Sequence, residues 1–232
     1  AGSHAMMSTI RSLVRLGYKV HFVGDNFWHY PGTNYLNALQ SIGVEVLYGQ
    51  QYNGKVIDWV KKNRDFISHI ILSRPHISIK YLDDVKLITS APILYYAHDL
   101  GYLRAGRELD IGVSKDDSGL KTTLSLESEL MQKSDVTLVF SNEEVKQLGI
   151  DFPSIDVFRI PLANYDVNPE EFLVSERHSV IFVGGFQHSP NVDAVDWFLT
   201  HVWTDVITAF PSVSFELVGS NMPDGLRDRA RS

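Results

Sequence analysis

A histidine and an aspartate, His98 and Asp99, stand directly after an apolar run that predicts a buried strand over residues 93–97. Ligands of open parallel α/β sheets bind beyond the carboxyl ends of the strands, so an imidazole at this position is placed to meet a substrate. Asp99 could orient the imidazole, or it could cap the helix that follows, in which case the pair is only structural. We take His98 and Asp99 as candidate catalytic residues and keep the structural interpretation open.

Further charged side chains follow this pair. Arg104, Arg107 and Glu108 are candidates to line the same cleft, and we single out Arg104 and Glu108 as cleft or acceptor-binding residues. The simpler alternative is that they are exposed charges on a helix, which need no function. Residues 105–118 are polar and irregular, so they predict a mobile loop.

A second candidate site lies in the last quarter of the chain. The pattern predicts a strand over Val180–Val183, a turn at Gly184 and Gly185, and a single helix over Val192–Ile207. Free amides at a helix N-terminus, together with the helix dipole, favour a phosphate. A tight turn that merely lets strand and helix pack explains the two glycines equally well.

Other ligand-binding motifs are incomplete. The dinucleotide fingerprint lacks its third glycine at the required spacing after Gly185. The segment Gly49–Lys55 matches GxxxxGK, but Val56 stands where a phosphate-binding loop needs Ser or Thr for Mg²⁺, so we favour turn geometry there. No two histidines have H-x₃-H spacing on one predicted helix, so we expect no metal.

Composition narrows the class of protein. The 232 residues are 44% hydrophobic and 21% charged, which is ordinary for a globular protein with a sizeable core. The net charge of −7, without a long Lys/Arg block, argues against a nucleic-acid partner. The absence of cysteine excludes disulfides and thiolate chemistry, and it fits a reducing, cytoplasmic compartment. No apolar run approaches the roughly 18–20 residues that cross a bilayer.

Strands alternate with helices along the chain, which predicts an α/β fold with a Rossmann-like doubly wound parallel sheet. We expect one domain over residues 7–163, a polar linker over 164–178, and the first βαβ part of a second Rossmann-like domain over 179–232. Residues 1–6 look like an expression-tag remnant and are expected to lie outside the fold. The rest begins with a helix, so we expect a central strand upstream, whose loss would leave free sheet edges and promote a homodimer.

Several segments in this order resemble the group 1 glycosyltransferases, retaining enzymes of the two-domain GT-B type. Residues 180–219 resemble the start of their C-terminal domain, whereas residues 73–76, 95–108 and 134–144 resemble parts of their N-terminal domain. The resemblance covers residues 7–219. It implies that the first domain is a GT-B N-terminal, acceptor-side domain and the second an incomplete donor-binding domain.

The resemblance implies transfer of a sugar from a nucleotide sugar to a glycan or lipid-linked acceptor, with retention of configuration. His98 matches the histidine that contacts the transferred sugar, and the donor diphosphate would lie between the domains near Gly184, Gly185 and Phe186. The family commonly works without metal, because amides and cations neutralise the departing diphosphate. We therefore expect no cofactor. The resemblance also implies an enzyme of polysaccharide biosynthesis that lies in the cytoplasm and associates peripherally with the inner face of the membrane.

Three departures from the family pattern bear on activity. The donor-binding Glu-x₇-Glu segment and the glycine-bearing loop after the first strand are absent, and the turn over residues 186–189 carries no Arg or Lys. We expect these 232 residues by themselves to catalyse little transfer. The alternatives are a sugar-nucleotide epimerase of GT-B-like fold and a non-catalytic scaffold domain of a polysaccharide-assembly protein.

Overall fold

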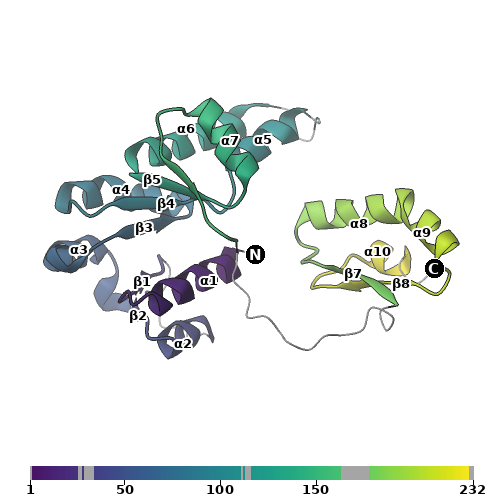
Figure 1. Ribbon diagram of the computed structural model, residues 1–232, viewed down its shortest axis with the longest axis horizontal. Helices are drawn as coiled ribbons and strands as arrows, with labels where there is room; N and C mark the ends of the chain where they lie inside the picture. The colour runs from purple at the N-terminus through teal and green to yellow at the C-terminus, as the bar shows by residue number, and fades with distance from the viewer. Residues whose placement is uncertain are drawn as a thin grey trace. The chain divides into compact units, whose positions relative to one another are not determined.

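The chain folds into two compact units of α/β architecture (Figure 1). The computed structural model describes residues 2–25, 28, 34–110, 112, 116–162 and 178–229. Unit 1 is Ala1–Asp166 and unit 2 is Val167–Ser232. The division falls inside the linker expected over 164–178, and all but the last residue of that linker lies outside the described residues.

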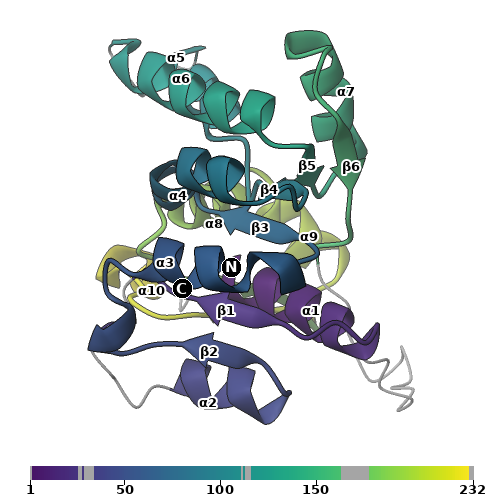
Figure 2. The ribbon, with the colours of Figure 1, turned by 90° about the vertical axis from the view of Figure 1, so that its left-hand side faces the viewer.

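Unit 1 contains two parallel sheets. The larger has the strand order β3-β4-β5-β6, with β3 at Ile70–Ser73, β4 at Ile93–Tyr96, β5 at Val136–Val139 and β6 at Val157–Arg159. The smaller pairs β1 (His21–Val23) with β2 (Glu45–Leu47) and lies on the β3 side of the larger sheet (Figure 1, Figure 2). The arrangement is compatible with a Rossmann-like fold. We expected one continuous sheet, but no strand among the described residues pairs with both β1 and β3.

Helices connect these strands. They are α1 (Gly2–Arg15), α2 (Asn34–Ser41), α3 (Val56–Asn63), α4 (Pro75–Ile88), α5 (Gly101–Asp110), α6 (Ser118–Lys133) and α7 (Asn142–Asp151), with 3₁₀ turns at Gln50–Tyr52 and Arg64–Phe66. The start of α7 is a capping box, because the Ser141 hydroxyl accepts from the Glu144 amide and the Glu144 carboxylate accepts from the Ser141 amide. No described helix is both long enough and apolar enough to cross a membrane.

Two predictions for unit 1 are corrected. Helix α1 begins at Gly2, so residues expected to lie outside the fold are helical, and the Ala5 side chain is only 4% exposed. The predicted loop over 105–118 is helical as far as Asp110. Its many polar residues obscured an amphipathic helical pattern, and the first turn of the helix is held by contacts of Tyr102 with Glu127 on α6 and Asp151 on α7.

The main core of unit 1 lies between the larger sheet and its helices. Tyr95 and Val139 on the strands meet Leu82, Leu130 and Leu148 from α4, α6 and α7, and all five are buried. Such side chains typically contribute about 1.5–3 kcal/mol each when removed from water. A second, smaller core fills the space around β1 and β2 under α1 and α2.

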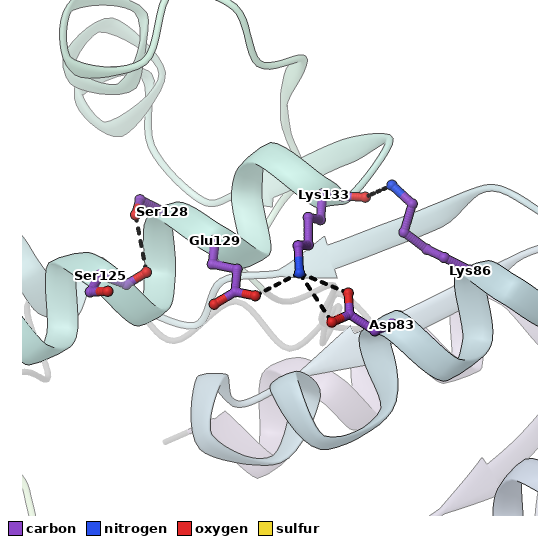
Figure 3. A network of polar contacts seen from close by, with 6 residues as sticks. All are labelled: Asp83, Lys86, Ser125, Ser128, Glu129 and Lys133. Carbon is purple, nitrogen blue, oxygen red and sulfur yellow. Dashed lines mark hydrogen bonds and ion pairs between the residues drawn. The ribbon is translucent and has the colours of Figure 1, made fainter.

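A polar network joins α4 and α6 on the surface of unit 1 (Figure 3). The Lys133 ammonium lies 2.8 Å from a carboxylate oxygen of Asp83 on α4 and 2.6 Å from one of Glu129 one turn earlier on α6. Lys86 donates to the Lys133 carbonyl at 2.5 Å. Because these groups are exposed or only partly buried, the network orients the two helices more than it stabilises them.

Asp25 fastens the smaller sheet to helix α4. It follows β1, and its carboxylate accepts from the Tyr81 hydroxyl at 2.5 Å and from the Lys80 ammonium at 2.7 Å. Burial alone would raise the pKa of Asp25, but the hydrogen bonds from Lys80 and Tyr81 outweigh it and the pKa is lowered from 3.8. Burial and the Asp25 hydrogen bond raise the pKa of Tyr81 to about 12.

Unit 2 is a two-stranded parallel sheet with helices. Its elements are β7 (Ser179–Val183), α8 (Ser189–His201), α9 (Trp203–Ala209), β8 (Ser214–Val218) and α10 (Asp224–Arg229). We predicted one helix over Val192–Ile207, but the backbone breaks at Val202, whose amide still donates to the Phe198 carbonyl. After the break, Trp203 packs against Phe198 and Phe215, at ring-centroid distances of 6.2 and 5.5 Å.

The Asp25 contacts predict a local loss of stability on substitution. Asp25→Asn removes the charge that accepts from Lys80 and Tyr81, so we expect the opening free energy of the smaller sheet to fall by about 1–3 kcal/mol. Amide hydrogen exchange at Glu45 on β2, whose amide donates to the Val20 carbonyl at 3.0 Å, measures it. Because the folded pKa of Asp25 is lowered, this stabilisation is present above pH 3.8 and is lost as the pH falls through the folded pKa.

The matched control is Asp84→Asn, which makes the same charge change at an exposed position of α4. It should leave exchange of the Glu45 amide unaltered. Equal protection of the Glu45 amide in the Asp25 variant and in the unmodified chain would show that Asp25 does not fasten the smaller sheet.

Candidate functional site

The carboxyl ends of three neighbouring strands of unit 1 lie level with one another. Ser73, the last residue of β3, is opposite Tyr96 in the ladder, and Tyr96 is opposite Leu138 on β5. The segments that leave these strands therefore begin at the same edge of the sheet. They carry His98 after β4 and Ser141 after β5, which is the edge where open α/β sheets bind ligands.

His98 is held at this edge by contacts from two strands. Its Nε2 lies 2.7 Å from the Ser73 hydroxyl, and the tautomer decides which of the two atoms donates. The imidazole also packs edge-on against the Tyr96 ring, with the centroids 4.8 Å apart. The Tyr96 hydroxyl in turn lies 3.4 Å from the Thr9 hydroxyl on α1. The half-buried ring is thus fixed in one orientation.

The surroundings of His98 keep it neutral. Burial and then the Arg74 charge lower the pKa of His98, and Asp99 acts in the opposite direction without compensating, so that the pKa is about 4. Arg74 stands between β3 and α4 with a φ of 71°, a backbone conformation that is uncommon outside glycine. At neutral pH the ring therefore offers one donor and one acceptor and carries no charge.

A polar cavity of about 440 Å³ adjoins the segment that carries His98. Asp99, Arg104 and Arg107 line it from the β4–α5 side, and Glu143 and Gln147 line it from α7. Asp99 and Arg104 form an ion pair with side chains 55% and 59% exposed, so the pair is weak and a ligand can compete for it. Asp99 caps no helix through a described hydrogen bond. Glu108 is exposed and does not line the cavity.

Glu127 is the member of this region that the sequence did not reveal. Its side chain is 2% exposed, and its two carboxylate oxygens accept from the Gly101 and Tyr102 amides at 2.9 and 3.0 Å. Glu127 lies on α6, 26 residues beyond Gly101. In the sequence it looks like any polar residue on a surface helix. Arg107, expected from the sequence as a candidate to line the cleft, is among the residues that line the cavity, whereas nothing in the local sequence marked Gln147 as cavity-lining.

In unit 2, hydrogen bonds within the fold already use two of the three backbone amides of the predicted phosphate site. The Gly184 amide donates to the Val218 carbonyl at 2.9 Å, and the Phe186 amide donates to the Ser220 carbonyl at 3.0 Å. The Phe186 side chain is buried in the core of the unit. Of the three predicted residues, only Gly185 has an amide without a hydrogen bond among the described contacts. It precedes α8 by a few residues.

The rejected motifs have structural explanations. Gly49 and Gly54 of the GxxxxGK segment have φ of 91° and 66°, so the turn itself requires glycine, as the turn interpretation predicts. Among the described residues, no three His, Cys, Asp or Glu side chains are grouped so as to hold a metal ion.

The chain matches no family model, and no curated protein matches it.

The buried neutral imidazole predicts an acid-sensitive contribution to stability. The folded pKa of His98, about 4, lies below the ordinary value of 6.5, so the unfolded chain binds more protons between these values and stability falls as the pH drops from 6.5 to 4. His98→Gln should reduce that loss. Urea unfolding of unit 1 at several pH values across this range measures it.

His69→Gln serves as the control, because His69 is exposed in the same unit. The His69→Gln variant should show the same dependence of stability on pH as the native chain. An identical slope of stability against pH in the His98 variant and in the native chain would contradict a neutral, buried imidazole.

Proposed function

We propose that the chain belongs to a nucleotide-sugar glycosyltransferase that acts with retention, and that His98 contacts the transferred sugar. The observation that supports this best is the half-buried, neutral imidazole at the carboxyl edge of a parallel sheet, fixed by Ser73, with the residues that follow it, from Asp99 onward, lining a cavity. The GT-B resemblance of the sequence gives this geometry its specific interpretation.

A neutral imidazole suits sugar transfer for an electrostatic reason. Cleavage of a glycosyl bond passes through a transition state with oxocarbenium-like positive charge on the sugar. An imidazolium against that ring would repel the developing charge, whereas a neutral His98 can still accept a hydrogen bond from a sugar hydroxyl or donate one to it. The low pKa of His98 keeps the ring in this form at neutral pH.

The adjoining cavity supplies groups for a hydroxyl-rich acceptor. Arg104 and Arg107 present planar donors, and Asp99 and Glu143 present acceptors, around a space of about 440 Å³. The Gln147 side-chain amide already donates to Asp151. Guanidinium and carboxylate groups match pairs of neighbouring hydroxyls. This combination fits a glycan acceptor better than an apolar one.

Unit 2 would contribute to diphosphate binding through Gly185. Its amide is close to the start of α8, a helix of 13 residues whose dipole favours an anion. The turn brings no cationic side chain to the phosphate, because residues 186–189 are Phe, Gln, His and Ser. We therefore expect weak donor binding and little turnover from this chain.

An NMR titration of the whole chain tests the proposal. A nucleotide sugar should shift the Gly185 amide and the His98 ring signals together, at ligand concentrations around the millimolar range that corresponds to about −4 kcal/mol. The matching free nucleoside diphosphate, which lacks the sugar, should shift Gly185 but leave His98 in place. His98→Ala should preserve the response of Gly185.

Three outcomes would count against the proposal. The first is the absence of any shift at Gly185 and His98 with uridine-, guanosine- and adenosine-linked sugars. The second is rearrangement of the free nucleotide sugar without an acceptor, which would identify an epimerase. The third is robust sugar transfer that His98→Ala leaves unaffected.

A further inference from the structure

Helix α5 begins on a buried carboxylate from another helix. The first two amides of α5, those of Gly101 and Tyr102, donate to the two oxygens of Glu127 on α6 at 2.9 and 3.0 Å. A helix N-terminus leaves its first amides without intrahelical partners, and a carboxylate satisfies them while complementing the helix dipole. Here the capping group comes from 26 residues away in the sequence rather than from the usual local residue.

The arrangement leaves little room for change. Burial raises the pKa of Glu127, and the hydrogen bonds from the Tyr102 and Gly101 amides oppose that rise. A Cβ atom at position 101 would lie 2.9 Å from the Glu127 oxygen and 2.9 Å from the Thr123 methyl group, so the close approach requires glycine there. A buried charge is costly unless it is hydrogen-bonded, so the bonds from both amides stabilise the carboxylate as well as the helix.

The segment that carries His98 is short and is fixed at both ends. At one end the Ala97 amide donates to the Leu138 carbonyl on β5 at 3.0 Å. At the other end Glu127 holds the Gly101 amide. Between the two anchors lie only His98, Asp99 and Leu100. Displacement of the second anchor must therefore move the residues that carry the imidazole and the neighbouring carboxylate.

We infer that Glu127 is a positioning residue for His98, which fixes the β4–α5 segment so that the imidazole stays packed between Ser73 and Tyr96. Its importance for sugar transfer rests on the function proposed above. Its effect on the imidazole does not, because that effect follows from the geometry of unit 1 alone. Tyr102 adds a second attachment for α5, since its hydroxyl donates to Asp151 on α7 at 2.5 Å.

Glu127→Gln tests the inference with nearly the same side-chain shape. The glutamine can accept from only one of the two amides, because its NH₂ group faces the other donor with donors of its own. Exchange of the Gly101 and Tyr102 amides should accelerate by at least tenfold, while the Val139 amide in the core of β5 should stay protected. The control is Glu129→Gln, which removes the same charge from a partly buried, Lys133-paired position of α6.

The pKa of His98 gives a second readout, because the direction of its change distinguishes loosening of the segment from the loss of a charge. Groups that face the imidazole are Arg74, which lowers its pKa, and Asp99, which raises it. Loss of a negative charge from Glu127 would by itself lower the pKa of His98 or leave it unchanged. Loosening of the segment hydrates the ring, and the pKa of His98 should then rise from about 4 toward 6.5. ¹⁵N-histidine NMR, with the signal assigned through His98→Gln, measures it.

The inference is overturned if Glu127→Gln folds and His98 titrates at its native pKa, or if Glu129→Gln causes the same rise. If Glu127→Gln does not fold, Gly101→Ala displaces the same carboxylate without changing any charge, and the same rise is expected. A rise in either variant, together with no response of the unmodified chain to nucleotide sugars, would support the positioning role and reject the proposed function. The two claims therefore fail separately.

Discussion

The register of the parallel strands in unit 1 is the constraint on which the candidate site depends. Because Ser73 ends β3 opposite the end of β4, its hydroxyl reaches the imidazole that follows β4 two residues later. A slip of one residue in either strand would turn Ser73 to the other face of the sheet and separate the pair. The neutrality of His98 and its fixed orientation both follow from this register and from the burial that the sheet edge provides.

Much of unit 1 could be predicted from local sequence, because its signals are local. The apolar runs of β3, β4 and β5 and the capping box at Ser141 are contained within a few residues, and the structure has them. The position of His98 followed from one rule about strand ends. Glu127 could not be found in this way, since its role depends on a partner far along the chain, and the first two amides of α5 are satisfied by that same contact.

Unit 2 illustrates a different limit. A glycine pair after a strand fits a phosphate-binding turn and a packing turn equally well, because both need the same backbone freedom. The structure commits the Gly184 and Phe186 amides to neighbouring carbonyls and places Phe186 in the core, which leaves Gly185 as the residue with an amide to offer. Only hydrogen-bond partners from β8 and the residues after it could distinguish these amides, and strand pairing is a long-range property.

Photo-crosslinking tests the central claim, contact between His98 and a transferred sugar, most directly. A nucleotide sugar with a diazirine on its sugar ring is irradiated with the chain, and the labelled residues are mapped by mass spectrometry. The account predicts labels within residues 96–107, which include His98 and the cavity residues that follow it. Labels confined to unit 2, or an even distribution that excess unmodified nucleotide sugar does not reduce, would contradict it.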